Sequence, residues 1–393
     1  MSIMRAVTCA GIVALQLAAP AAVLWAGDAP AAIVSLGQPK ERRLAETGDH
    51  PNHLFREQTA TFDLGDLTYA IGYKACVDEA HGDQVAPLEG YLGMPRPCSC
   101  NWYHGGFLAV IVNGHDIGTT RLSSMMVVEN GARAVLDMVW HDPLADVRVR
   151  IVGLPGADHL ICDIALDPRQ EIESVALALR CYPSYFTSYH HRDGARRIQT
   201  PAELVEQGQN VTLPAAENWW ALYYDEIFDV ALGEGEGPCA LLIPSDEATE
   251  VRFAPGGYSV ETAITYPPDT RQMRLAVWDF KGVTNADALA RMRACADEVL
   301  AELGQDFTPP SLTEFDFAAA RDEINKVLAN PQGREALGEQ ADEVERWLAE
   351  RAPAVEHGAQ GASVSDEEQL LQSIDRFNDL KWQVRIIGLL YEL

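Results

Sequence analysis

The chain has 393 residues, of which 47% are hydrophobic and 22% are charged, so its composition is that of an ordinary globular protein. This length allows two domains and a sizeable core. Its 58 acidic residues outnumber its 30 Lys and Arg residues, and the net charge of −28 at pH 7 excludes nucleic acids and anionic lipid surfaces as partners.

The first thirty residues carry the most specific signal in the chain. Arg5 supplies a positive charge, residues 6–26 are almost wholly apolar, and Gly27-Asp28-Ala29-Pro30 follows. This order predicts a secretory signal peptide over residues 1–26 and a protein that is secreted, periplasmic or in the cell envelope, with no membrane contact after cleavage. The alternative is an uncleaved anchor, because the run approaches the ~20 residues that span a bilayer.

Residues 50–282 have the pattern of β-strands. Segments rich in β-branched and aromatic residues alternate with turn signals, and Asn130-Gly131 between two apolar runs is the strongest hairpin signal among them. Few helical patterns interrupt these segments, so we expect antiparallel strands in two packed sheets. The predicted strands are 59–63, 67–77, 107–113, 122–129, 132–140, 147–154, 159–166, 172–182, 219–224, 240–243, 250–253, 258–265 and 273–280.

Residues 283–393 have the pattern of helices. Thr284 or Asn285 begins a helix that ends at Gly304, and a second helix covers 315–328. Asn330-Pro331 begins a third helix, whose apolar positions extend to Leu348.

Residues 353–363 are predicted to be a Gly/Ala-rich linker before the last helix. Ser365-x-x-Glu368 matches a capping box that would open that helix. Its apolar stripe, which includes Ile374, Phe377, Val384 and Ile387, is expected to pack against the protein itself. The predicted fold class is therefore mainly β, a large antiparallel β-sandwich followed by a C-terminal α-helical segment.

Eight cysteines are present, and Cys9 belongs to the leader. Cys98 and Cys100 lie in a Pro/Gly-rich stretch and are the best disulfide candidates, each paired elsewhere, with Cys76 as one candidate partner. Cys162, Cys181 and Cys239 lie in apolar runs and are interpreted as small buried hydrophobic residues. No set of four ligands has zinc spacing, so neither a metal nor a cofactor is predicted.

Three clusters of polar and aromatic residues are candidate binding or catalytic segments. Residues 182–193 form the densest cluster, in a long loop, and long loops on sheet scaffolds often carry function. Its ligand-binding candidates are Tyr185, Tyr189 and Arg192, and its catalytic candidates are His190 and His191. The other clusters supply Trp102, His104, Trp219, Trp220 and Tyr224 as ligand-binding candidates and Asp225 and Glu226 as catalytic candidates.

Two classes of function fit these observations. The first is an exported carbohydrate-binding or carbohydrate-active β-sandwich protein, since aromatic faces stack on sugar rings while His, Arg and Asp bind hydroxyls. Catalysis would use His190 or His191 as general acid and Asp225 or Glu226 as general base. This architecture resembles the mutarotase-like supersandwich at the level of fold alone.

The second class is a non-enzymatic cell-envelope structural or interaction protein whose C-terminal helices bind a partner. An exposed apolar stripe on the last helix would favour this class, and a buried stripe would favour the first. The nucleotide-binding glycine motifs, H-E-x-x-H and G-x-S-x-G do not occur in the chain, so no motif decides whether it is an enzyme. The sequence leaves the oligomeric state open.

Overall fold

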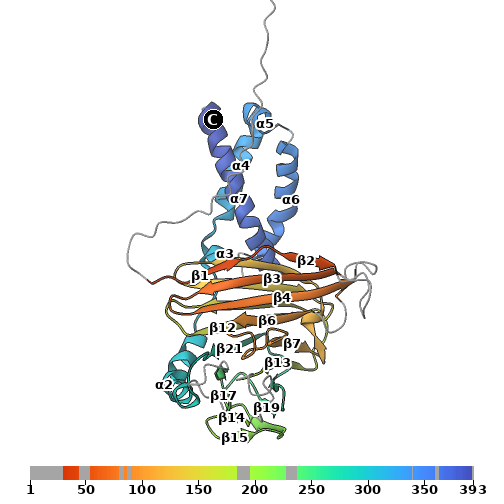
Figure 1. Ribbon diagram of the computed structural model, residues 1–393. Coiled ribbons are helices and arrows are strands. Elements are labelled where there is room, and N and C mark those ends of the chain that lie inside the picture. The colour runs from red at the N-terminus through yellow and green to blue at the C-terminus, as the bar shows by residue number, and fades with distance from the viewer. Residues whose placement is uncertain are drawn as a thin grey trace, which may run out of the picture.

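The computed structural model describes residues 30–43, 54–78, 84–85, 90–183, 195–226, 237–338, 340–358 and 363–391. Its strands form two antiparallel sheets that pack face to face, and helices follow them in the chain (Figure 1). The predicted fold class is therefore confirmed. The predicted signal peptide lies outside the described residues. In the part of the chain that is described, no helix is both long and apolar enough to cross a membrane.

The first sheet has twelve strands in the order β1-β3-β4-β6-β7-β13-β20-β19-β16, with β2, β5 and β8 paired at its sides. Two of its strands precede residue 50, where the predicted sandwich begins, because β1 and β2 both pair with β3. The strands are β1 (Ile33–Leu36), β2 (Lys40–Arg43), β3 (Leu54–Asp63), β4 (Thr68–Asp78), β5 (Gln84–Val85), β6 (Tyr91–Arg96), β7 (Leu108–Val112), β8 (His115–Asp116), β13 (Val175–Cys181), β16 (Val211–Pro214), β19 (Glu250–Pro255) and β20 (Val260–Tyr266).

The second sheet has nine strands in the order β15-β14-β17-β18-β21-β12-β11-β10-β9. The hairpin predicted at Asn130-Gly131 joins β9 to β10, and Val135 pairs with Glu129 beside the turn. The strands are β9 (Leu122–Glu129), β10 (Ala134–His141), β11 (Ala145–Gly153), β12 (His159–Pro168), β14 (Arg196–Gln199), β15 (Leu204–Glu206), β17 (Trp220–Asp225), β18 (Cys239–Leu242) and β21 (Gln272–Asp279).

The main core lies between the sheets, and a second core covers the outer face of the nine-stranded sheet. In β13, Val175, Leu177 and Leu179 point into the main core while the residues between them are half-buried or exposed, the period of two of a strand with one open face. In β11 every residue is buried, because Val152 on its outer face packs in the core that helix α2 (Asn285–Leu303) forms with that sheet, while Arg148 pairs with Glu367 and Arg150 donates to the Phe307 carbonyl. Both faces of the nine-stranded sheet are thus used for packing.

Helix α2 follows its sequence signals. Thr284 is the N-cap, and its side chain accepts a hydrogen bond from the Asp287 N–H. The residue after the helix is Gly304. The buried residues recur at helical spacing and form the face that meets the sheet: Ala288, Met292, Ala296, Val299 and Leu303.

The remaining helices form a projection on top of the sandwich (Figure 1). They are α3 (Pro310–Glu314), α4 (Phe317–Ala329), α5 (Pro331–Leu337), α6 (Gln340–Gly358) and α7 (Val364–Tyr391). They have a hydrophobic core of their own, in which Ile324, Val344 and Phe377 are buried. The expected burial of the α7 stripe is confirmed, since Phe377 and Val384 are buried and Ile374 and Ile387 pack against them.

Three details of the helical segment differ from the expectations. The third predicted helix is two helices, because Gly338 adopts φ 59° between α5 and α6. Helix α6 continues through Pro353 to Gly358, within the predicted linker. Ser363 is the capping residue of α7, since its hydroxyl accepts from the Asp366 N–H at 3.1 Å. The predicted capping pair, Ser365 and Glu368, lies inside the helix.

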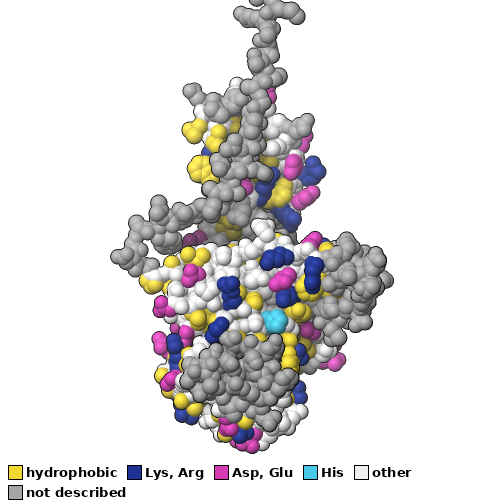
Figure 2. Space-filling model, viewed as in Figure 1, with side chains coloured by type: hydrophobic (Ala, Val, Ile, Leu, Met, Phe, Trp, Pro, Cys, Tyr) yellow, Lys and Arg dark blue, Asp and Glu magenta, His cyan; other side chains and the backbone are white. Residues whose placement is uncertain are grey.

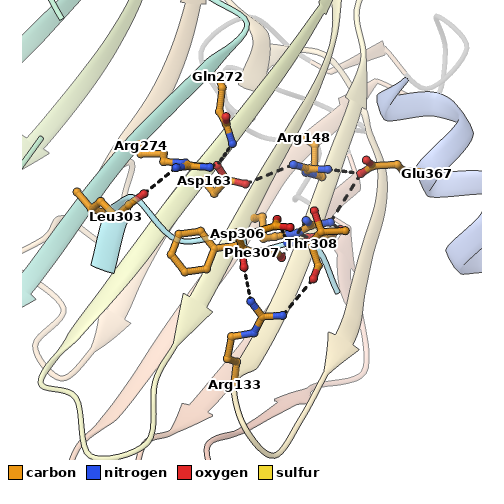
Figure 3. A network of polar contacts seen from close by, with 12 residues as sticks. Arg133, Arg148, Asp163, Gln272, Arg274, Leu303, Asp306, Phe307, Thr308 and Glu367 are labelled. Atoms are coloured by element: carbon orange, nitrogen blue, oxygen red, sulfur yellow. Dashed lines mark hydrogen bonds and ion pairs between the residues drawn. The ribbon is translucent and has the colours of Figure 1, made fainter. Parts of the chain in front are cut away.

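Polar contacts join α7 to the outer face of the nine-stranded sheet. Glu367 pairs with Arg148, whose guanidinium also lies 3.4 Å from Asp163 (Figure 3). Glu368 accepts from His141 Nε2 at 2.7 Å. Glu368, predicted as a capping residue, therefore fixes the helix to the sandwich instead.

Three arginines, Arg150 and Arg274 from strands of this sheet and Arg133 from the turn between β9 and β10, bind the segment that leaves α2. Arg133 and Arg274 donate to backbone carbonyls within residues 303–308, at 2.7 to 3.1 Å (Figure 3). Arg150 donates to the Phe307 carbonyl in the same segment at 3.1 Å. Cations are favourable beside the carbonyls that end a helix. These contacts hold the connection between the sandwich and the helical projection.

Candidate ligand-binding site

The twelve-stranded sheet is split between β6 and β7. These neighbouring strands share a single register pair, Leu92 with Leu108, whereas β3 and β4 share ten. A cavity of about 330 Å³ lies at the split. Its lining includes Trp140 and Val149 of the facing sheet, so it reaches from the outer face toward the interior. Its volume is within the range of small-molecule sites.

Glycines allow the chain to fold closely around this cavity. Gly90, Gly105 and Gly106 line it. A Cβ atom at Gly93 would lie 2.0 Å from the carbonyl oxygen of His104, so only glycine lets residues 101–106 approach β6. The split is therefore built by the local sequence of β6 and of the segment that precedes β7.

One carboxyl group, Asp116, lies at the end of β8 and lines the cavity. It accepts a hydrogen bond from the Gly118 N–H at 2.8 Å. Burial raises the pKa of Asp116 above its ordinary value, although the Gly118 N–H and His115 act in the opposite direction. A carboxyl group in this state can donate or accept a proton nearer to neutral pH than a solvated one can.

Arg180 and Glu261 form an ion pair at the edge of the cavity, with a distance of 2.6 Å between Nε and Oε1. They come from adjacent strands, β13 and β20, where they are register partners. Ala109, Ile111 and Ala178 are half-buried lining residues, and they give the cavity an apolar floor. The site thus combines an apolar surface with charged groups at its edge.

A cluster of tyrosines, Tyr103, Tyr182 and Tyr258, lies beside this ion pair. The Tyr103 and Tyr258 hydroxyls are 3.4 Å apart, and the Tyr182 and Tyr258 rings are 4.6 Å apart. The hydrogen bond with Tyr103 raises the pKa of Tyr258, and Arg180 is close enough to lower it. Tyr258 is 59% exposed, so its ring is available to a ligand.

The structure places Trp102 and His104 on the segment that borders the cavity. Trp102 is fully buried, and its indole N–H donates to the Trp278 carbonyl at 2.8 Å. His104 is half-buried, with Nδ1 2.8 Å from the Ser99 carbonyl oxygen. Trp102 therefore supports this segment from the core. His104 directly precedes Gly105, which lines the cavity, so it is the predicted site residue nearest in sequence to the lining.

Trp219, Trp220 and Tyr224 lie away from the cavity. Tyr223 points into the main core and Trp220 to the other face of the sheet, as alternation along a strand requires. That other face is covered by α2, and Trp220 is buried in the resulting second core, with Trp219 and Tyr224 packed against it. The face that carries Trp220 is therefore covered by the protein's own helix.

The two predicted carboxylates lie at the end of β17. Asp225 is buried and accepts from the Ala195 N–H at 3.0 Å. Glu226 is exposed and forms an ion pair with Arg197 at 2.9 Å. Neither residue lines the cavity.

The remaining candidates, Tyr185, Tyr189, His190, His191 and Arg192, lie outside the described residues. The described residues that flank this segment contact each other, because the Arg196 guanidinium lies 4.8 Å from the centre of the Tyr182 ring. Tyr182 belongs to the tyrosine cluster beside the cavity. The roles of these five residues stay predictions.

No sequence pattern pointed to Asp116, Arg180, Tyr258 or Glu261 as site residues. They come from β8, β13, the turn before β20 and β20 itself, and only strand pairing brings them together. The one local signal is the pair of turns, Asn113-Gly114 and Gly256-Gly257, that precede Asp116 and Tyr258. In the part of the chain that the structure describes, no three His, Cys, Asp or Glu side chains are grouped to hold a metal ion.

Comparisons with known proteins give weak structural likenesses only. No protein-family model matches the chain, and no curated protein matches it. A proposed aldose 1-epimerase from Klebsiella pneumoniae is 10% identical with a TM-score of 0.37, over 70% of this chain and 97% of that one. A proposed aldose 1-epimerase from Escherichia coli K12 is 8% identical with a TM-score of 0.32, over 56% of this chain and 97% of that one.

The α-N-acetylgalactosaminidase NagBb from Bifidobacterium bifidum, solved with GalNAc, is also similar. It is 10% identical with a TM-score of 0.38, over 70% of this chain and 41% of that chain. These neighbours are carbohydrate-related proteins. At this identity and TM-score, the likeness says nothing about the activity of this chain.

Proposed function

We propose that this protein is an exported carbohydrate-binding protein whose ligand, a small sugar, occupies the cavity between β6 and β7. The observation that carries this proposal is the cavity of about 330 Å³ with an apolar floor and with Asp116, Arg180 and Glu261 among its lining residues. A sugar ring has an apolar C–H face and a rim of hydroxyl groups. Carboxylates accept hydrogen bonds from hydroxyl groups and a guanidinium donates to them.

The tyrosine cluster supports the same class of ligand. Tyr258 is largely exposed and lies against Tyr103 and Tyr182 beside the ion pair of Arg180. Tyrosine presents a rigid apolar ring with a polar end, which suits a ligand that is apolar on one side and hydroxylated on its edge. Export rests on the leader sequence over residues 1–26.

Acid–base chemistry on the bound sugar is the catalytic form of this proposal. His190 or His191 would act as general acid, with Asp225 or Glu226 as the general base predicted from the sequence. Asp225 and Glu226 do not line the cavity, and they are engaged by the Ala195 N–H and by Arg197. Asp116 is the further carboxyl group to test, because it lines the cavity and its pKa is raised by burial.

Calorimetric titration with neutral mono- and disaccharides tests binding. We expect saturable binding by the wild type, and affinity reduced about tenfold or more by Arg180→Ala, since a hydrogen bond to a charged group contributes ~1.5–3 kcal/mol. Arg252→Ala is the matched control, because Arg252 is exposed on β19 of the same sheet and does not line the cavity. No binding at millimolar sugar would overturn the proposal.

Exchange of sugar anomers, followed by NMR, tests the catalytic form. Asp116→Asn and His190→Gln should slow the exchange. Glu226→Gln shows whether Glu226 or Asp116 is the carboxyl group that acts. If the wild type bound a sugar but left anomer exchange at the rate in buffer, the protein would be a binding protein without this activity.

A second candidate function is a non-enzymatic interaction role in the cell envelope. It is favoured by three exposed apolar residues on α7, Trp382, Ile386 and Leu389, on the helical projection where hydrophobic side chains are visible in Figure 2. We would compare the share of the protein in the envelope fraction for the wild type and Leu389→Glu. A protein found wholly in the soluble fraction, whatever residue 389 is, would exclude this role.

A further inference from the structure

Two cysteines that are far apart in the sequence meet in the core between the sheets. Cys181 is the last residue of β13 in the twelve-stranded sheet, and Cys239 is the first residue of β18 in the nine-stranded sheet. Both are buried free thiols of the same core cluster, and, besides the effect of burial, Cys181 lies close enough to Cys239 to raise the pKa of its thiol. The apolar runs around them predict small buried hydrophobic residues and give no sign that the two meet.

The backbone at Asn101 and Trp102 fixes both cysteines independently of this contact. The Cys239 Sγ lies 3.5 Å from the Asn101 carbonyl oxygen. The same oxygen accepts from the N–H of Tyr182, the residue after Cys181, at 2.9 Å. Trp102 forms a β-bridge with Cys181 itself. One short segment thus holds the ends of both strands at one place.

We propose that Cys181 and Cys239 form a disulfide bond that joins the two sheets of the sandwich. In this step the two S–H bonds break and one S–S bond forms. The two electrons reduce an oxidant of the disulfide class to two thiols, and the thiol protons pass to that oxidant or to solvent. A disulfide that crosses a β-sandwich beside a buried Trp is a known means of joining two sheets.

Burial decides when this bond forms. Both side chains are closed off from solvent, and burial raises the pKa of the Cys239 thiol, which disfavours the thiolate that exchange requires. The exchange therefore takes place while the core is still open, during folding in an oxidising compartment. The proposal depends on export only for this supply of oxidant, and it does not depend on sugar binding.

This disulfide would join the two sheets at one end of the sandwich. It closes a loop between residues 181 and 239, and such a loop restricts the unfolded chain more than a short loop does. It also ties together the strand ends that border residues 184–194 and 227–236. Cys98 lies near enough to influence Cys239 by its charge, so it is the competing partner that the experiment must distinguish.

The test is to refold the reduced full-length chain in a buffer of oxidised and reduced glutathione. Remaining thiols are then alkylated with iodoacetamide in denaturant without reductant, and the digest is analysed by mass spectrometry. We expect one peptide pair linked through Cys181 and Cys239, with Cys162 alkylated. Alkylation of both Cys181 and Cys239, or a link from Cys239 to Cys98, would overturn the proposal.

Two variants provide matched controls. Cys162 is buried on β12 to the same degree as Cys181, so Cys162→Ala should keep the cross-link. Cys181→Ala should leave Cys239 open to alkylation. Dithiothreitol should lower the melting temperature of the wild type and of Cys162→Ala but not of Cys181→Ala; equal effects on all three would count against the bond. Cross-linked protein that binds no sugar would refute the proposed function and leave this inference standing.

Discussion

The Arg150 guanidinium is bound to Asp137 within the nine-stranded sheet by two hydrogen bonds of 2.7 Å, and each side chain is 1% exposed. We expect Asp137→Ala to lower the free energy of unfolding by ~3–5 kcal/mol, because it leaves a buried charge without its partner. Glu41→Ala is the control, since the Arg56–Glu41 pair is exposed and such pairs contribute up to ~1 kcal/mol. Urea unfolding measures both, and equal losses would contradict the prediction.

His159 lies between two carboxylates, with Nε2 2.9 Å from Glu302 and Nδ1 3.3 Å from Asp158. Burial would lower the pKa of His159, but hydrogen bonds to Asp158 and Glu302 outweigh it and raise the pKa. Protonated His159 therefore stabilises the folded state fully below its unfolded-state pKa of ~6.5, and this stability is lost as the pH rises through the higher folded-state pKa.

The consequence is a melting temperature that falls as the pH rises above about 6.5. His159→Gln should remove this part of the pH dependence, whereas His104→Gln, at a half-buried position bonded to a backbone carbonyl, should keep it. Differential scanning fluorimetry across this range gives the answer. Parallel curves for wild type and His159→Gln would show that the imidazole makes no such contribution.

Helix α7 begins at Val364, and Ser363 supplies the cap. Ser363→Ala should cost ~0.5–2 kcal/mol of stability, because it removes the acceptor for the Asp366 N–H. Ser365→Ala, two residues later within the helix, should cost less. Thermal unfolding of the two variants separates the observed cap from the one expected from Ser365-x-x-Glu368.

The core of the helical projection is centred on Phe377. Its ring lies 4.7 Å from those of Phe317 and Trp347, and it is fully buried. Phe377→Ala should cost ~3–5 kcal/mol. Trp382→Ala, at a position that is 66% exposed on the same helix, should change stability little. Circular dichroism melting tests this, and a larger loss from Trp382→Ala would mean that α7 is docked on its other face.

Regular elements were predictable where the local pattern was strong. The ends of α2 follow from Thr284 and Gly304, and β9 matches its predicted range of residues 122–129. Strand β6 was missed, because Gly93 and Pro95 weaken its β pattern, and its place in the sheet comes from pairing with β4. The break at Gly338 was also missed, since the apolar spacing continues across it.

At the scale of the whole molecule, the sandwich and the helical projection have separate cores, with no residue in common among those described. We expect calorimetry to resolve two unfolding transitions, with Phe377→Ala lowering one and Ile164→Ala, in the main core, lowering the other. A single transition shifted equally by both variants would contradict this. It would mean that the contacts of Glu367 and Glu368 couple the two cores.

The candidate site depends on long-range pairing, which explains why the sequence did not reveal it. Asp116 and Arg180 are 64 residues apart, and Glu261 is a further 81 residues along the chain. Each is an ordinary polar residue in its own strand, and the cavity exists only because β6 and β7 share one register pair. Aromatic clusters were visible in the sequence, but whether α2 or solvent covers Trp220 is decided by packing.

The burial of β11 on both faces slows the exchange of its amide hydrogens with solvent. All nine of its residues are buried, so its amides should take up deuterium last, when the sandwich opens as a whole. The outer positions of β13 are half-buried or exposed, and substitutions there disturb less packing. Outward positions of β13 should therefore tolerate substitution better than any position of β11.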